Sequence, residues 1–219
     1  MEKILAIYKP KGPSSNQILE EIRKVVGIKK VGHAGTLDPL ARGVLVVAIG
    51  RKATKKLAKI FSKEKEYIAK IKLGWQSTTD DQEGKKIKIK VSEIPSVRKI
   101  EKILNSFKGK ISQIPPSFSA VKVKGKEAYK LAREGKFPLL KARKVEIQAI
   151  EILAYQWPYL KLKVVTGPGV YIRALARDIG RKLKTGAYLV ELERIRVGNF
   201  TKEKTLSIDQ IKQIFQNKK

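Results

Sequence analysis

The feature that most constrains the fold is a continuous apolar run over residues 44–49, which lies between two glycines, Gly43 and Gly50. Short apolar runs bounded by turn residues are typical of strands that are buried on both faces. Glycine at each end permits the backbone to turn sharply there. The run therefore predicts a central, fully buried strand.

Strand-like and helix-like segments alternate along the rest of the chain. Alternating apolar positions predict strands over residues 4–8, 66–73, 87–91, 145–152 and 160–164. Helical spacing of apolar residues predicts helices over residues 14–26, 53–60, 97–103, 129–132, 171–183 and 208–215. Ser14 and Gln17 form a capping box at the start of the first helix. This pattern favours an α+β fold with a mixed, largely antiparallel central sheet flanked by helices.

The net charge indicates a polyanionic partner. Forty-nine Lys and Arg residues face twenty Asp and Glu residues, which gives a formal net charge of +29. Nucleic acid is the natural partner of such a field, because neutralising its phosphates releases counterions. A lysine-rich proteome of an AT-rich or hot-growing organism is the alternative explanation. A membrane surface is less favoured, because the basic residues are spread along the whole chain.

Missing residues exclude several kinds of chemistry. The chain has no cysteine and one histidine, which excludes disulfides, thiol catalysis and the ligand sets of zinc fingers and zinc deaminases. It contains neither G-x-S-x-G nor G-x-x-x-x-G-K-[ST]. No apolar run reaches the ~20 residues that span a bilayer, and the N-terminus lacks a signal-peptide pattern. A polyanion-binding enzyme that uses a carboxylate is what remains, and the absence of cysteine fits the expected cytoplasmic location.

The segment 32–43 is the first candidate site. Three glycines and Pro39 surround the single histidine, His33, and Asp38. A loop attached to a central strand is a rigid platform for a reactive group, and Pro39 restricts Asp38 to extended geometry. Taken alone, an Asp-Pro pair also fits an ordinary turn. His33 fits acid–base work, contact with an RNA base, or a buried hydrogen-bonded role.

Two further candidates carry an arginine and an aromatic ring. Residues 166–173 predict a strand end, a Gly-Pro-Gly turn and a helix with Arg173 in its first turn. An arginine beside a catalytic carboxylate would keep it ionised and oriented, although a surface arginine after a turn is the alternative. Tyr67, on the strand 66–73, fits either base stacking or the core.

Together these segments resemble the TruB-type tRNA pseudouridine-55 synthases, in order and spacing over nearly the whole chain. The matching motifs are Tyr8-Lys9-Pro10-Lys11-Gly12-Pro13-Ser14-Ser15, Gly32-His33-Ala34-Gly35-Thr36-Leu37-Asp38-Pro39-Leu40-Ala41-Arg42-Gly43-Val44-Leu45, Gly50-Arg51-Lys52-Ala53-Thr54-Lys55, Lys65-Glu66-Tyr67, Leu73-Gly74 with Thr78, Thr79, Asp80 and Gly84, Gln113-Ile114-Pro115-Pro116-Ser117-Phe118-Ser119-Ala120-Val121-Lys122, Gly169-Val170-Tyr171-Ile172-Arg173, and Leu192-Glu193-Arg194.

The resemblance implies isomerisation of uridine 55 in the T-loop of tRNA, in a cleft across the sheet of the pseudouridine synthase fold. It implies that Asp38 is the essential aspartate, that Tyr67 stacks on the target base and that Arg173 pairs with Asp38. His33 would contact RNA near the flipped nucleotide. The remaining expected contacts with substrate are Lys9, Pro10, Gly35, Thr36, Tyr171 and Leu192. Neither cofactor nor metal is implied, and the enzyme is expected to act as a monomer.

The chain departs from the family pattern at two motifs. The family's frequent Cys-Ser-x-Gly-Thr-Tyr-Ile-Arg is here Thr166-Gly167-Pro168-Gly169-Val170-Tyr171-Ile172-Arg173, and Glu193 replaces a frequent arginine. Typical members also carry a C-terminal RNA-binding PUA domain. We expect one catalytic domain over residues 1–219, with a terminal helix in 206–219 and no PUA domain.

Two other functions stay open at this point. One is a related synthase with another RNA target, such as a guide-RNA-dependent enzyme of the dyskerin type. The other is a non-catalytic RNA-binding or tRNA-folding protein. The presence of Asp38, Tyr67 and Arg173 argues against the second alternative.

We predict that binding of tRNA weakens strongly between about 50 and 200 mM salt, because each neutralised phosphate releases counterions. Titrations followed by fluorescence anisotropy at a series of salt concentrations measure this dependence. Equal affinity at the two ends of the range would contradict the electrostatic account.

Overall fold

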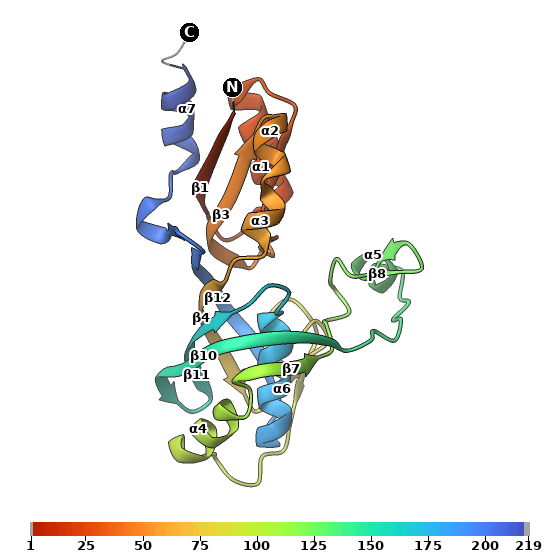
Figure 1. The fold of residues 1–219 in the computed structure, drawn as a ribbon. Helices are drawn as coiled ribbons and strands as arrows, with labels where there is room; N and C mark the ends of the chain where they lie inside the picture. Colours follow the sequence, from red (N-terminus) through yellow and green to blue (C-terminus); the bar gives the residue numbers. More distant parts are fainter. Residues whose placement is uncertain (1, 217–219) are drawn as a thin grey trace. The chain divides into compact units, whose positions relative to one another are not determined.

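The computed structural model describes residues 2–216, which form two compact units (Figure 1). Unit 1 contains the described residues of 1–68 and 192–219, and unit 2 contains residues 69–191. Two strands, β4 (Lys65–Leu73) and β12 (Ala187–Val197), run from one unit into the other. Residues 217–219 of the expected terminal helix lie outside the described residues, and the single-domain expectation stays a prediction.

Unit 1 is built around one central strand. Its strands are β1 (Lys3–Lys9), β2 (Val31–His33), β3 (Ala41–Ile49) and β13 (Phe200–Thr201), with the ends of β4 and β12. Its helices are α1 (Ser15–Val26), α2 (Arg51–Lys55), α3 (Leu57–Phe61), the 3₁₀ helix η1 (Lys202–Lys204) and α7 (Ile208–Gln216). β3 is antiparallel to β1 and β2 and parallel to β12, so it is the central strand of this unit.

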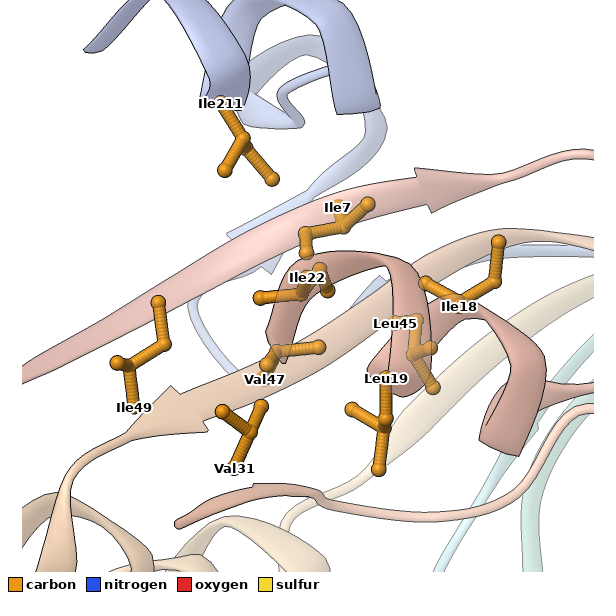
Figure 2. Close-up of a cluster of buried hydrophobic side chains, with 9 residues drawn as sticks. All are labelled: Ile7, Ile18, Leu19, Ile22, Val31, Leu45, Val47, Ile49 and Ile211. Atoms are coloured by element: carbon orange, nitrogen blue, oxygen red, sulfur yellow. The ribbon is translucent and has the colours of Figure 1, made fainter. Parts of the chain in front are cut away.

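The side chains of β3 are buried on both of its faces. Leu45, Val47 and Ile49 pack with α1, β1, β2 and Ile211 of α7 in one apolar cluster (Figure 2). Val44 and Val46 pack into a second cluster on the opposite face, against which α3 also packs. The prediction of a strand buried on both faces is thus confirmed, and its apolar side chains join two cores.

Helix α1 begins and ends at residues that its sequence predicts. Ser14 accepts a hydrogen bond from the Gln17 amide and the Gln17 side chain accepts one from the Ser14 amide, which confirms the capping box. Gly27 ends the helix in the left-handed conformation, with φ of 67°. Ile18, Leu19 and Ile22 form its buried face.

Unit 2 is a largely antiparallel sheet with helices. Its strands are β5 (Trp75–Ser77), β6 (Lys86–Lys88), β7 (Gly109–Gln113), β8 (Lys122–Val123), β9 (Lys126–Glu127), β10 (Arg143–Gln156) and β11 (Tyr159–Thr166), with parts of β4 and β12. Its helices are α4 (Val97–Asn105), α5 (Ala128–Arg133) and α6 (Ile172–Leu183). Hydrogen bonds order the main strands β12-β4-β11-β10-β7, while β5–β6 and β8–β9 form separate hairpins.

The predicted fold class is confirmed, because helices flank a sheet in which β3–β12 is a parallel pair, while β1 and β2 pair antiparallel with β3, and β7 and β11 pair antiparallel with β10. Two segments differ from the prediction. The helix expected over residues 53–60 is divided into α2 and α3, because the Lys56 amide bonds to Ala53, three residues back. The strand expected over residues 87–91 ends at Lys88, because its partner β5 has only three residues.

The sequence pattern did not predict β12, the strand that lies beside β3. Its apolar residues do not alternate regularly, and Arg194 is only 1% exposed in the strand's interior. A buried arginine breaks the pattern by which a strand is recognised. No helix within residues 2–216 is long and apolar enough to cross a bilayer.

We predict that Gly43→Ala destabilises unit 1 more than Gly12→Ala does. Both glycines have a positive φ, 112° and 113°, so each substitution strains the backbone by roughly 1–3 kcal/mol. A Cβ on Gly43 would also lie 2.7 Å from the Arg194 nitrogen, whereas a Cβ on Gly12 meets nothing within 4 Å. Overpacking adds a further ~1–3 kcal/mol. Urea denaturation of the two variants measures the difference, and equal losses would contradict the close approach.

Candidate active site

Asp38 lies in the loop of residues 34–40 between β2 and β3, partly exposed. The backbone on both sides of Asp38 is held by the first residue of α1 and by the turn that precedes this helix. The Ser15 hydroxyl bonds to both the amide and the carbonyl of Leu37, each at 2.9 Å. The Gly12 amide donates to the Pro39 carbonyl at 2.8 Å. Asp38 is therefore presented on a fixed stretch of backbone.

Arg194 of β12 holds the loop on which Asp38 lies. Its side chain is buried, and its Nε and Nη2 donate to the carbonyls of Val44 and Gly35 at 2.8 and 3.0 Å. Arg194 can lie this close to β3 only because residue 43 is glycine. Any side chain on residue 43 would collide with the Arg194 backbone. The arginine thus ties the start of the loop to β3.

Lys9, at the end of β1, is a buried cation near the loop. Its Nζ donates to the carbonyls of Pro10 and Pro13 at 2.8 and 2.7 Å, and it is 0% exposed. Burial lowers the pKa of the Lys9 amine from 10.5 to about 8, while the carboxylate of Asp38 opposes the shift and Arg194 adds to it. Lys9 and Asp38 therefore lie within electrostatic reach of each other.

Two more basic groups lie in the interior of unit 1, His33 partly exposed and Lys65 buried. The Nδ1 of His33 has no hydrogen-bond partner among the described residues, so His33 is not a fully hydrogen-bonded buried histidine. Burial and the charge of Arg194 lower the pKa of the His33 imidazole, which favours its neutral form. Lys65 donates to the carbonyls of Phe61 and Lys63, each at 2.8 Å, and burial lowers the pKa of its amine to about 8.

The other predicted residues of unit 1 occupy different settings. Pro10 and Thr36 are exposed, and Gly35 has a positive φ of 89° while its carbonyl binds Arg194. Leu192 is buried on β12 and pairs with Ala41 of β3. Tyr67 is 6% exposed and lies on the buried face of β4.

The departure at Glu193 is explained by its neighbours. The Glu193 carboxylate accepts a hydrogen bond from the Tyr8 hydroxyl at 3.0 Å and forms ion pairs with Arg42 at 3.4 Å and Lys202 at 2.6 Å. An acid at this position balances two cations of unit 1, where a second arginine would add to their charge.

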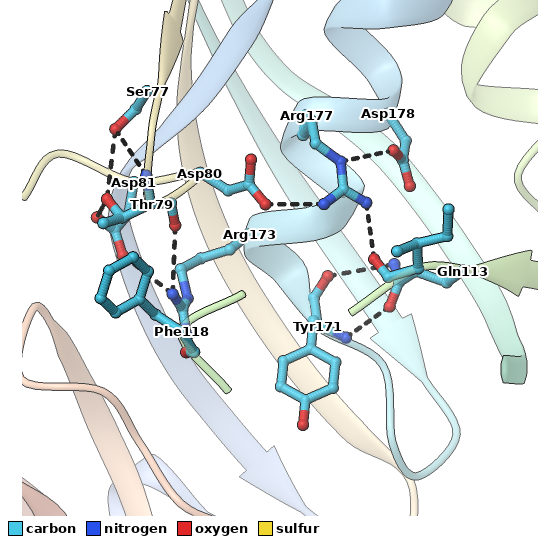
Figure 3. A network of polar contacts seen from close by, with 11 residues as sticks. Ser77, Thr79, Asp80, Asp81, Gln113, Phe118, Tyr171, Arg173, Arg177 and Asp178 are labelled. Carbon is cyan, nitrogen blue, oxygen red and sulfur yellow. Dashed lines mark hydrogen bonds and ion pairs between the residues drawn. The ribbon is translucent and has the colours of Figure 1, made fainter. Parts of the chain in front are cut away.

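In unit 2, the guanidinium of Arg173 contacts residues from two other segments of the sequence (Figure 3). It lies in the first turn of α6, as predicted, and is 5% exposed. Its Nη1 lies 3.4 Å from the Asp81 carboxylate and 3.3 Å from the Thr79 carbonyl, and its Nη2 donates to the Phe118 carbonyl at 2.8 Å. These contacts fix the plane of the guanidinium.

The adjacent aspartates have separate partners. Asp81, which is 2% exposed, also accepts hydrogen bonds from the Thr79 hydroxyl and the Glu83 amide. Asp80 has a positive φ of 62° and accepts from Arg177 at 2.8 Å. Burial raises the pKa of the Asp80 carboxyl, and Arg177 opposes the shift. Asp80, which belongs to a matching motif, thus pairs with Arg177, while Asp81 beside it pairs with Arg173.

Tyr171 is held at the start of α6 by one side chain. Gln113 of β7 accepts from the Tyr171 amide at 2.9 Å and donates to its carbonyl at 3.2 Å. These two hydrogen bonds fix the backbone of Tyr171, at which α6 begins. They therefore also fix the direction in which the Arg173 side chain points from the helix.

Sequence reasoning did not assign roles to five residues that hold this machinery. They are Ser15, Lys65, Asp81, Gln113 and Arg194. All except Asp81 stood inside the motifs that carry the family resemblance, so the motifs located them without giving their function. Among residues 2–216, no group of three or more His, Asp or Glu could hold a metal ion. The predicted pairing of Arg173 with Asp38 joins residues of two units and stays a prediction.

Two family models match this chain. Residues 23–172 match the TruB family pseudouridylate synthase N-terminal domain, and residues 173–219 match the tRNA pseudouridylate synthase B C-terminal domain.

Relatives of known name agree with these matches. The tRNA pseudouridine synthase B of Clostridium novyi is 46% identical over 96% of this chain and 72% of the relative, and that of Clostridium tetani is 43% identical over 96% and 73%. Among solved structures, a Cbf5-Nop10-Gar1 complex matches with a TM-score of 0.73 and 30% identity, over 94% of this chain. The chain spans about half, 53%, of that solved chain.

We predict that Lys65 makes unfolding free energy rise with pH between about 8 and 10.5. In this window the unfolded chain still holds a proton that native Lys65, with its pKa of about 8, has released, so stability increases with pH. The stability difference between wild type and Lys65→Met should therefore grow in favour of wild type across the window. Urea denaturation at several pH values measures it.

The exposed Lys59→Met serves as the control and should show no such change with pH. A constant difference between wild type and Lys65→Met from pH 8 to 10.5 would contradict the buried, proton-releasing state of Lys65.

Proposed function

Because the chain belongs to the TruB family of pseudouridylate synthases, we propose that it converts uridine 55 in the T-loop of tRNA to pseudouridine. The observation that carries the proposal is the Asp38 loop, whose backbone is held by Ser15, Gly12 and Arg194 beside the buried ammonium of Lys9. The identity of 43–46% to two tRNA pseudouridine synthases B supports tRNA as the substrate.

The reaction breaks a C–N glycosidic bond and forms a C–C bond without net oxidation or reduction. The target nucleotide must leave its stack to reach a carboxylate, at a cost of a few kcal/mol. Stacking on Tyr67 and phosphate contacts with this chain of net charge +29 offset that cost. The reaction therefore depends on placement of the nucleotide rather than on redox chemistry.

Asp38 is the catalytic carboxylate in this proposal. Preorganisation is what a reacting group needs, since a shift of about 1 Å costs up to 100-fold in rate. The hydrogen bonds to Leu37 and Pro39 support the preorganisation of Asp38, because they hold the residues on either side of it. The carboxylate of Asp38 also attracts the positive charge of Lys9.

Arg173 is the orienting arginine in this proposal, and it pairs with Asp38. The support is its fixed guanidinium, held by Asp81, Thr79 and Phe118 inside unit 2. A guanidinium held on several sides loses little freedom when it binds a further carboxylate. We also propose that the chain works in the cytoplasm as a monomer that contacts the T-arm of tRNA.

A guide-RNA-dependent reaction is the second candidate. The similarity to the solved Cbf5-Nop10-Gar1 complex favours it. Identity is lower there, 30% against 46% for the Clostridium novyi relative, so tRNA remains the first candidate. Pseudouridine formed in unmodified tRNA by the purified chain alone supports the first candidate, and product only at other RNA sites supports the second.

We predict that Asp38→Asn binds unmodified tRNA with wild-type affinity but forms no pseudouridine at position 55. The amide cannot supply the charge of the carboxylate, while the basic surface that binds phosphate is unchanged. Pseudouridine mapping after incubation and a binding titration measure the two properties. Asp209→Asn, on the exposed surface of α7, is the matched control and should keep full turnover. Turnover retained by Asp38→Asn would refute the assignment of Asp38, and binding without product by wild type would refute catalysis.

A further inference from the structure

Ser15 occupies an unusual place beside the Asp38 loop. It is the first residue of α1 and is 1% exposed, although serine normally lies at the surface. Its hydroxyl donates to the Leu37 carbonyl and accepts from the Leu37 amide, both at 2.9 Å across 22 residues of sequence. One side chain therefore satisfies both backbone groups of the residue that precedes Asp38.

The hydroxyl suits this double contact. A serine hydroxyl is a donor and an acceptor at once, so it can bind an amide and a carbonyl of the same residue. Leu37 is 3% exposed, so its backbone has little access to water that could replace these bonds. Removing the hydroxyl would leave two polar groups unpaired in the interior, and the loop would have to move to pair them.

Ser15 is itself held by its surroundings. Helix α1 packs Ile18, Leu19 and Ile22 into the apolar core of unit 1, which fixes the position of its first turn. Lys9 donates to the carbonyls of Pro10 and Pro13 and so orders the turn before the helix. Through Ser15, the fixed backbone of α1 therefore also holds the loop of Asp38.

We propose that Ser15 is a positioning residue for the reaction, which rests on the proposed function of Asp38. Its hydroxyl fixes the backbone of Leu37 and thereby sets where the Asp38 carboxylate stands. It does not contact substrate. Loss of the hydroxyl should therefore slow the chemical step and leave tRNA binding intact.

The test compares Ser15→Ala with Ser14→Ala. Both remove a serine hydroxyl from the start of α1, but the Ser14 hydroxyl accepts from the Gln17 amide, whereas the Ser15 hydroxyl bonds to Leu37. We expect Ser15→Ala to lower kcat by about 10- to 100-fold with KM and tRNA affinity within about threefold of wild type. Ser14→Ala should keep kcat within about threefold, while losing stability as an N-cap variant does.

Three outcomes would overturn the proposal: equal kcat loss in the two variants, unchanged kcat in Ser15→Ala, or a rise in KM alone. If Ser15→Ala does not fold, Ser15→Cys replaces it, because a thiol is close in size but a weak hydrogen-bonding group. A kcat loss in that variant supports the role of the hydroxyl, and wild-type kcat overturns it.

Amide hydrogen exchange separates this proposal from the proposed function. The Leu37 amide should exchange slowly in wild type and in Ser14→Ala and much faster in Ser15→Ala or Ser15→Cys. This readout requires no turnover, so it tests the contact between Ser15 and Leu37 even if wild type forms no pseudouridine. Absence of product in wild type would refute the proposed function without bearing on that contact. Rapid exchange of Leu37 in wild type would show that the Ser15 contact does not form.

Discussion

The close approach of β12 to β3 at Gly43 is the contact on which the candidate site in unit 1 depends. Because position 43 carries no side chain, the Arg194 backbone can pair with β3 in parallel register. The buried Arg194 side chain then reaches two carbonyls, at Val44 and Gly35, that bracket the loop of Asp38. A backbone constraint at one residue therefore determines where a charged side chain can act.

The buried charged residues around the candidate site in unit 1 are basic. Lys9, Lys65 and Arg194 are all buried in unit 1, and the two lysines carry lowered pKa values because burial disfavours their charge. Each of these cations donates to backbone carbonyls, which supply the hydrogen bonds that water would otherwise provide. Unit 2 adds a carboxylate, since Arg173 donates to two backbone carbonyls and is also paired with the buried Asp81. Both arrangements hold a charge in a fixed position.

Local sequence predicted much of the fold and less of the site. The capping box of α1 and the doubly buried β3 follow from spacing that acts over a few residues. β12 could not be predicted in this way, because the burial of Arg194 is decided by partners 150 and 159 residues away in sequence. The same holds for Ser15, whose serine gives no local sign that Leu37 will be its partner. Asp38 was proposed as the catalytic residue because its glycine- and proline-rich loop matches a family motif, whereas Asp81 lies outside the matching motifs.

Unit 1 is discontinuous in sequence, since residues 69–191 lie between its two segments. A ribosome releases chain from the N-terminus, and segments begin to fold as they emerge. Asp38 and Ser15 emerge early, but Arg194 emerges only after all of unit 2. The loop of Asp38 thus gains its arginine support only after unit 2 has been translated, and a nascent chain that stops before Arg194 carries the carboxylate without that support.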